Sequence, residues 1–376
     1  MSSSSQSRLR GSRQSGTLAA ERQLRPDQRQ PWRVRRAAIA AVVLALAGGL
    51  AACSSGSSPS SSSSASAAQL QSSYEQVVDH VLPSVVQIST SNSTGSGVVY
   101  NSSGDIVTNA HVVGTATAVT VREPVGNKEM SASVVGTFTP DDLAVIRVQG
   151  STSGLKPAAW ANSNNVSVGE IVLAMGNPLG LTDSVTQGIV SATGRTVGEG
   201  SGSSALITSA IQTSAAINPG NSGGALVNLN DQVIGIPTLA AQLPDQGGAA
   251  PGIGFAIPSD TVKDIAGQLI KDGRVTKSDR AAIGISGETS ANSSGAGVGV
   301  GVISVTSGGT AAQAGVAAGD VIVGINNQKV TSVADLQYVL AQLTPGTKVT
   351  IHYTSGSSST PKTGTGTLGS LTSTGS

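Results

Sequence analysis

Short apolar segments alternate with turn residues over much of the chain, from residue 85 to residue 258. They recur about every ten residues, as is typical of all-β domains. They are rich in Val, Ile and Leu, as in Val85–Ser89, Leu143–Val148 and Ile253–Ile257. Many short strands at this spacing favour a β-barrel or a β-sandwich. We therefore predict a mainly β domain in this part of the chain.

Apolar residues at helical spacing flank this β-rich region. Those from Leu70 to Val81 recur every three to four residues, which predicts a short amphipathic helix that ends before Pro83. Residues 261–272 predict a closing helix, because their apolar side chains share one face and a glycine follows as a stop. These elements delimit a first domain over residues 69–275.

A second unit extends from residue 281 to residue 370. Its apolar positions have strand spacing in some segments and helical spacing in others. The pattern predicts strands at 297–305, 320–325 and 348–353, and helices at 310–314 and 332–343. We therefore expect a small α+β domain of about 90 residues, a normal size for an independent domain.

Composition restricts the chemistry. Only 11% of the residues are charged and 2% are aromatic, so the core must consist of Val, Ile, Leu and Ala. Residues 1–36 hold nine Arg against two acidic residues, which leaves 13 basic against 19 acidic residues in the remainder. A mildly acidic body argues against nucleic-acid binding. With one Cys, three His and no HExxH or GxxxxGK[ST] motif, no metal and no cofactor is expected.

The first 53 residues have the features of a targeting segment. An uncharged apolar run, residues 37–52, follows the Arg-rich stretch, which is the order found in a secretory signal. The run ends in LAAC, which resembles the bacterial lipobox and makes Cys53 the candidate for lipidation. The run has 16 residues, slightly fewer than the roughly 20 that a spanning helix needs. A short N-terminal anchor helix stays open as the alternative.

The low-complexity stretch 54–68 consists almost entirely of Ser and Ala. Such a segment buries too little apolar surface to fold, so we predict a flexible tether. The rest of the protein is then expected outside the cytoplasm, attached to the bacterial cell membrane through residues 1–53.

Three residues have the types needed for amide hydrolysis. Hydrolysis requires a nucleophile, a base, a group that orients the base and donors for the oxyanion. His111 ends a strand in TNAHVV, Asp142 leads into a strand in DLAVI with Asp141 as its rival, and Ser222 lies in NPGNSGG. They are 31 and 80 residues apart in the order His, Asp, Ser, which is the chymotrypsin order. His80 and His352 lack such surroundings.

The glycines around Ser222 allow a tight bend that exposes consecutive N–H groups. These are the N–H groups of Gly220, Asn221 and Ser222, which could face a developing oxyanion. The chymotrypsin order further suggests two barrels, residues 85–150 with the His and Asp and residues 165–258 with the Ser.

Several longer motifs resemble the HtrA/Deg family of serine proteases. They are TNAHVV, DLAVI, MGNPLG, TQGIVSATGR, INPGNSGGALVNLNDQVIGI and GIGFAIPS. The later motif TAAQAGVAAGDVIVGINNQ resembles the PDZ domain of that family. The resemblance implies a chymotrypsin-like double β-barrel protease domain followed by one PDZ domain. It also implies an ATP-independent endopeptidase of the cell envelope that degrades unfolded or damaged proteins, generally as a homotrimer.

The resemblance assigns further roles by motif. His111 matches the general base, Asp142 its carboxylate partner and Ser222 the nucleophile. Ala216, six residues before the serine, matches the floor of the S1 pocket, with Ile217 and Ile236 as expected walls. Such an apolar pocket should prefer Val, Ala or Ile at P1 over Lys or Arg.

Two assignments concern regulation. Arg195 matches a sensor-loop arginine, although a solvated loop arginine is an equal alternative. Ile283, Gly284 and Ile285 match the carboxylate-binding loop of the PDZ domain, where a peptide C-terminus would add a strand. A non-catalytic chaperone or peptide sensor that uses this groove is the rival function.

Overall fold

The computed structural model describes residues 62–126, 128–177, 184–198, 205–218, 220–242, 249–355 and 360–373. The expected targeting segment with Cys53, and most of the expected tether, lie outside the described residues. Within these ranges, none of the helices has the length and hydrophobicity needed to cross a bilayer.

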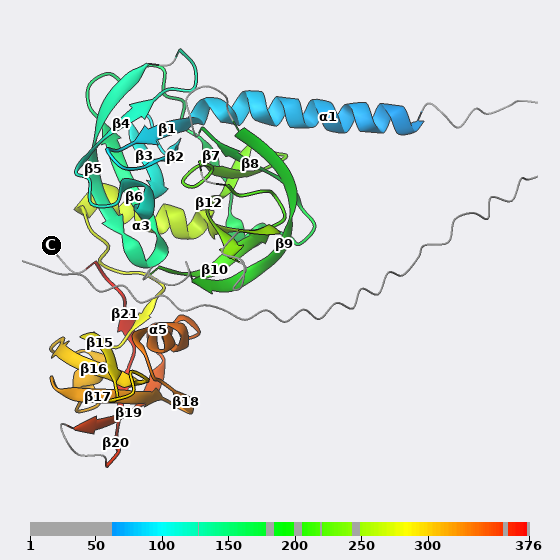
Figure 1. Ribbon diagram of the computed structural model, residues 1–376. Coiled ribbons are helices and arrows are strands. Elements are labelled where there is room, and N and C mark those ends of the chain that lie inside the picture. The colour runs from blue at the N-terminus through cyan, green and yellow to red at the C-terminus, as the bar shows by residue number, and fades with distance from the viewer. Residues whose placement is uncertain are drawn as a thin grey trace, which may run out of the picture. The chain divides into compact units, whose positions relative to one another are not determined.

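The first half of the β-rich domain is a closed barrel of six antiparallel strands (Figure 1). Its order is β1-β2-β3-β6-β5-β4. Alternate side chains such as Val86, Ile106 and Ile146 fill its interior, as the period-2 side-chain geometry of strands requires. The strands are β1 (Val85–Ser89), β2 (Thr94–Val99), β3 (Asp105–Asn109), β4 (Ala118–Arg122), β5 (Glu129–Phe138) and β6 (Leu143–Val148).

The second half is a seven-stranded sheet of order β11-β8-β9-β10-β13-β12-β7. An additional pairing of β11 with β12 closes six of these strands into a second barrel. The strands are β7 (Ala159–Trp160), β8 (Ile171–Gly176), β9 (Ser184–Gly198), β10 (Leu206–Thr213), β11 (Ala225–Asn228), β12 (Gln232–Gln242) and β13 (Ala249–Pro258). Both halves thus form barrels, as the His-Asp-Ser order suggested.

The core between the barrels draws on both of them and on two helices. Phe138 and Leu143 of the first barrel pack with Met175 and Ile257 of the second. Helix α3 (Ser259–Asp272) adds its predicted apolar face and ends at Gly273, whose φ of 67° is the left-handed conformation of a glycine C-cap. Short helical turns complete the domain: η1 (Leu82–Ser84), α2 (Ala110–Val113), η2 (Thr139–Asp141) and η3 (Ser163–Asn165).

Helix α1 corrects one boundary. It spans Ser62–Val81, so it begins inside the stretch 54–68 that composition predicts to be a tether. Val77 and Val81 are buried in the inter-barrel core and anchor its C-terminal end. From that anchor the helix extends toward the N-terminus through a mixed Ser and Ala sequence, because adding residues to an existing helix costs little and Ala has the highest helix propensity.

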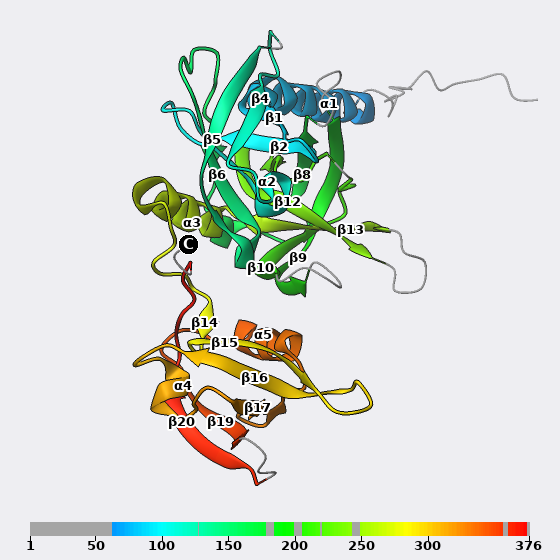
Figure 2. The same cartoon turned by 60° about the vertical axis from the view of Figure 1, so that its left-hand side comes forward.

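Residues 281–370 form a separate α+β unit with its own core (Figure 2). A sheet of order β15-β16-β17-β19-β20 packs with helix α5 (Val333–Ala341). The predicted strands and helices are present, and β15 and β20 are additional. Besides α5, the elements of this unit are β14 (Ala281–Ala282), β15 (Ile285–Ala291), β16 (Gly297–Val305), α4 (Thr310–Gln313), β17 (Asp320–Ile325), β18 (Gln328–Lys329), β19 (Lys348–Ser355), β20 (Lys362–Thr367) and β21 (Gly369–Ser370).

Candidate functional site

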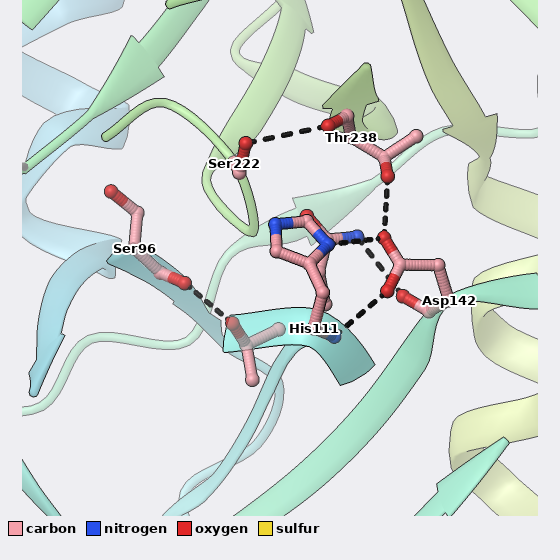
Figure 3. Close-up of polar contacts among 7 residues, drawn as sticks. Ser96, His111, Asp142, Ser222 and Thr238 are labelled. Carbon is pink, nitrogen blue, oxygen red and sulfur yellow. Dashed lines mark hydrogen bonds and ion pairs between the residues drawn. The ribbon is translucent and has the colours of Figure 1, made fainter. Parts of the chain in front are cut away.

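The pairing of β3 with β6 brings His111 and Asp142 together. Asn109, at the end of β3, lies opposite Leu143, at the start of β6. The residues just beyond these ends therefore share one edge of the first barrel. His111 Nδ1 lies 2.8 Å from Asp142 Oδ2, and the His111 N–H donates to Asp142 Oδ1 at 2.9 Å (Figure 3). One carboxylate thus contacts both the ring and the main chain of the histidine.

The conformation of Asp142 separates it from its neighbour Asp141. Asp142 has a φ of 51°, in the left-handed region, and its side chain is 2% exposed. The Asp142 carbonyl accepts bonds from the Ala110 N–H and from Asn109 Nδ2, both at 3.0 Å. Asp141 Oδ1 pairs instead with Arg280 at 2.8 Å. Of the two sequence candidates, only Asp142 contacts His111.

Ser222 lies in the serine loop, which we define as residues 220–224. Gly223 has a φ of 80°, and a Cβ there would come within 2.2 Å of Ser96 O. A Cβ at Gly224 would come within 2.1 Å of Met175 O. Both positions therefore require glycine, which explains the SGG sequence. In Figure 3 the His111 ring lies between the Asp142 carboxylate and Ser222.

Thr238 is a residue of the site that sequence reasoning missed. It lies on β12, and its hydroxyl donates to Asp142 Oδ2 while its carbonyl accepts from Ser222 Oγ at 3.4 Å (Figure 3). The residue is 4% exposed. A threonine in a strand is ordinary in β-rich sequence, so its local surroundings gave no signal. Its partner Asp142 lies 96 residues earlier, so no local motif could have identified it.

The turn before Ser222 contains the N–H groups that are expected to face an oxyanion. The Asn221 N–H donates to Asn218 O at 3.0 Å, which closes a four-residue turn. Gly220 has a φ of 113°, in the positive range that favours glycine. Because the Asn221 N–H is used inside the turn, its expected role as an oxyanion donor is corrected, and Gly220 and Ser222 stay the predicted donors.

The three residues expected around the S1 pocket occupy different environments. Ala216 is exposed, and its carbonyl accepts from Thr186 Oγ1 at 2.8 Å. Ile217 is 6% exposed and faces Gly254, where a Cβ would come within 2.5 Å of Ile217 Cγ1. Ile236 is completely buried in the inter-barrel core. It has no exposed surface that could line an open pocket, so its expected role as a pocket wall is wrong.

The predicted carboxylate-binding loop borders a cavity of about 730 Å³. Gly284 has a φ of 72°, and its carbonyl accepts the N–H of Thr306 at 2.8 Å. Ile283 is 2% exposed and belongs to the core of the second domain. The lining of the cavity includes the start of β15 and one side of α5, with the residues Ile283, Gly284, Ile285, Val333, Leu336 and Leu340.

Comparisons with known proteins identify both domains. A trypsin-like peptidase domain matches residues 95–236, and a PDZ domain matches residues 281–359. The chain is 35% identical to the serine endoprotease from Yersinia pestis, whose crystal structure superposes with a TM-score of 0.52 over 79% of this chain and 98% of that one. A structure of the HtrA-type protease AlgW with a tripeptide gives 31% identity, a TM-score of 0.52 and coverage of 79% and 96%. The chain belongs to the HtrA family of serine proteases.

Curated relatives within the HtrA family agree. The chain is 39% identical over 303 residues to the serine protease PepD of Mycobacterium tuberculosis, which covers 75% of this chain and 63% of PepD. It is 41% identical over 262 residues to the periplasmic pH-dependent serine endoprotease DegQ of Escherichia coli, covering 68% of this chain and 55% of DegQ. The alignments therefore span little more than half of these relatives.

The remaining polar candidates lie elsewhere in this HtrA-family chain. Arg195 is exposed on β9, opposite Ala210 of β10, and its sensor role stays a prediction. His80 Nδ1 pairs with Asp231 Oδ2 at 2.8 Å, and His352 lies on β19. Among the residues that the structure describes, no three His, Cys, Asp or Glu side chains cluster as metal ligands would.

Proposed function

We propose that this protein is a serine endopeptidase that uses Ser222, His111 and Asp142 to cleave unfolded or damaged proteins outside the cytoplasm. The observation that carries the proposal is the contact of Asp142 with both Nδ1 and the main-chain N–H of His111. A carboxylate at Nδ1 leaves Nε2 as the nitrogen able to accept a proton. The ring lies between that carboxylate and Ser222 (Figure 3).

The mechanism follows from the roles of these groups. Ser222 Oγ attacks the scissile carbonyl carbon, and its proton passes to His111 Nε2. The N–H groups of Gly220 and Ser222 stabilise the oxyanion. His111 then gives the proton to the leaving amine as the C–N bond breaks, and water releases the acyl group by the same steps in reverse. Asp142 keeps the ring in place and stabilises its protonated form.

Substrate preference is proposed from the exposed Ala216. A small neutral residue at the floor of the S1 pocket offers no charge to pair with Lys or Arg. Ile217, the next residue, packs closely against Gly254 and is the proposed apolar wall. We expect cleavage after small aliphatic residues such as Val, Ala and Ile.

The cellular setting is proposed from the sequence and from relatives. The apolar run 37–52 and Cys53 support attachment to the bacterial cell membrane by a lipid or by a single N-terminal helix. Relatives include the periplasmic proteases DegQ and DegP of Escherichia coli, which supports an extracytoplasmic location. Peptide C-termini are the expected ligands of the PDZ groove, and a homotrimer is the expected assembly.

The test compares degradation of β-casein by the full chain and by its Ser222→Ala variant, without ATP or added metal. Both are assayed with and without peptides that end in hydrophobic residues. We expect degradation by the wild type alone, and labelling of Ser222 by a fluorophosphonate. If wild type and variant are equally inert with every peptide tried, the rival chaperone or peptide-sensor function is favoured instead.

A further inference from the structure

Ser96, within β2, makes four hydrogen bonds although its side chain is completely buried. Its N–H donates to Ser222 O at 3.0 Å, and its hydroxyl donates to Gly220 O at 2.5 Å. The same hydroxyl accepts the N–H of Asn177 at 2.7 Å, where the chain leaves β8. The Ser96 carbonyl accepts from the Thr108 hydroxyl at 2.6 Å (Figure 3). One residue of the first barrel thus contacts the serine loop at two points.

Glycines on both sides of Ser96 allow this close approach. A Cβ at Gly95 would come within 2.7 Å of Val112 Cγ2, and a Cβ at Gly97 within 2.6 Å of Ile88 Cδ1. The strand therefore packs against its neighbours through main chain here. This brings β2 near enough for a side chain as short as serine to reach Gly220 O.

We propose that Ser96 is a positioning residue for the oxyanion hole. It binds the carbonyls of Gly220 and Ser222, the two residues whose N–H groups would stabilise the oxyanion. Each bond fixes the peptide group that follows the residue, and so limits how far the Cα atom that carries the N–H donor can shift or rotate. Ser96 acts through the main chain of the loop and does not touch the substrate. The inference rests on the proposed function, because it assigns Ser96 to the same site.

The turn needs such an external contact. Gly220 has no side chain, and its φ of 113° lies in a region that glycine enters without steric cost. Nothing in the residue itself keeps its peptide groups in one orientation. A hydrogen-bond donor must lie within a few tenths of an ångström of the oxyanion to be effective, and a shift of about 1 Å can cost about 100-fold in rate.

The contact depends on the hydroxyl group as both donor and acceptor. An alanine at position 96 would remove the donor to Gly220 O and the acceptor for the Asn177 N–H together. Both main-chain groups belong to buried residues, Asn177 being 3% exposed. Each would lose its partner in a site that water does not readily reach, so the turn should shift toward other partners.

The experiment compares Ser96→Ala with Ser259→Ala in the full chain. Ser259 is a matched control because it is also completely buried and its hydroxyl donates to Ala161 O at 3.0 Å, at the start of α3. For each variant we would measure kcat and KM on a peptide with Val at P1. We would also measure inhibition by the matching peptide boronate, which mimics the oxyanion, and the thermal unfolding midpoint.

For Ser96→Ala we expect kcat and boronate affinity to fall by about 10- to 100-fold, with KM nearly unchanged. This is less than the roughly 100- to 1,000-fold loss when a donor is removed, because here the donors stay and are only displaced. For Ser259→Ala we expect both to match the wild type, even where its unfolding midpoint falls as far. Equal kcat and boronate affinity in the two variants at equal stability would overturn the proposal. A rise in KM with kcat and boronate affinity unchanged would also overturn it.

A second variant covers the case in which Ser96→Ala does not fold. Ser96→Cys keeps the shape of the side chain but has only a weak donor, so its boronate affinity should fall measurably below that of the wild type. Wild-type affinity in a folded Ser96→Cys protein would count against the hydroxyl. The two proposals fail separately: activity that survives Ser222→Ala removes the proposed function, whereas unaltered boronate affinity in the position-96 variants removes only the role of Ser96.

Discussion

Thr238 donates its hydroxyl to Oδ2 of Asp142, the same oxygen that lies against Nδ1 of His111. The carboxylate of the first barrel is therefore held by a side chain of the second barrel. Because Thr238 also accepts the Ser222 hydroxyl at its carbonyl, one residue of β12 contacts two members of the proposed triad.

Replacing Thr238 by Val should lower kcat by roughly tenfold, the effect of one lost hydrogen bond to a charged group. Valine keeps the shape of the side chain and removes only the donor, so Asp142 loses part of what stabilises its charge beside His111. Steady-state kinetics on a Val-P1 peptide measures the change. Thr238→Ser, which keeps the hydroxyl, should stay close to the wild type, and an equal loss in both variants would contradict the explanation.

Local sequence was sufficient for some features of the site and not for others. His111, Asp142 and Ser222 could be proposed as a group because each lies in a motif whose local form suits its proposed chemistry, and the structure places His111 against Asp142. Thr238 and Ser96 could not, because each acts through a partner about 100 residues away, 96 and 124 residues for the two bonds. Nothing in the surrounding residues records such a contact.

The two corrected site residues show a second limit. Alternation along β12 indicates that Ile236 faces one side of the strand, but not whether that side lines a pocket or the core between barrels. The consecutive N–H groups near Ser222 were expected to act alike. In the folded turn the Asn221 N–H closes the loop instead, which depends on φ at Gly220 and is not visible in a run of letters.

The exposed Ala216 makes the P1 preference testable. We expect the wild type to cleave after Val, Ala and Ile, and hardly after Lys or Arg. Ala216→Asp should raise cleavage after Arg, because a carboxylate in the pocket can pair with the guanidinium. Mass spectrometry of products from a mixed peptide library measures this, with the neutral Ala216→Asn as the matched control. Strong tryptic cleavage by the wild type that disappears in Ser222→Ala would contradict the expectation.

The PDZ groove gives a binding prediction that is independent of catalysis. A peptide that ends in a free hydrophobic carboxylate should bind at least tenfold more tightly than its C-terminal amide, roughly the effect of one charge-assisted hydrogen bond. Val333, which is part of the cavity lining, offers a variant. Val333→Asp should weaken binding of the free acid by placing a like charge in the groove, whereas Val333→Ala should change it little. Fluorescence anisotropy with the Ser222→Ala protein measures both.

A buried ion pair links the linker between the domains to the residue next to Asp142. Arg280 donates to Asp141 Oδ1 at 2.8 Å and to Pro140 O at 2.7 Å, and it also donates to Leu206 O. Both side chains are less than one-tenth exposed, at 8% and 4%. Burial raises the pKa of Asp141, while the neighbouring guanidinium of Arg280 opposes that rise.

Replacing Arg280 by Met should lower the free energy of unfolding at pH 7 by about 3–5 kcal/mol, because it leaves a buried carboxylate without its partner. The loss should depend on pH in a specific direction. Without the guanidinium the folded-state pKa of Asp141 rises further above its unfolded-state pKa. At pH values between these two, the folded state therefore binds more protons than the unfolded state. Stability of the variant then falls as the pH rises through the folded-state pKa.

The destabilisation of Arg280→Met relative to the wild type should therefore be smallest near pH 4 and largest at pH 7. Denaturant unfolding of the full chain at pH 4, 5.5 and 7 measures it. The double variant Arg280→Met with Asp141→Asn removes the charge as well, so it should recover much of the stability at pH 7 and lose the pH dependence. A penalty that stays constant with pH in the single variant would show that Arg280 stabilises the turn through its bonds to Pro140 O and Leu206 O rather than through the ion pair.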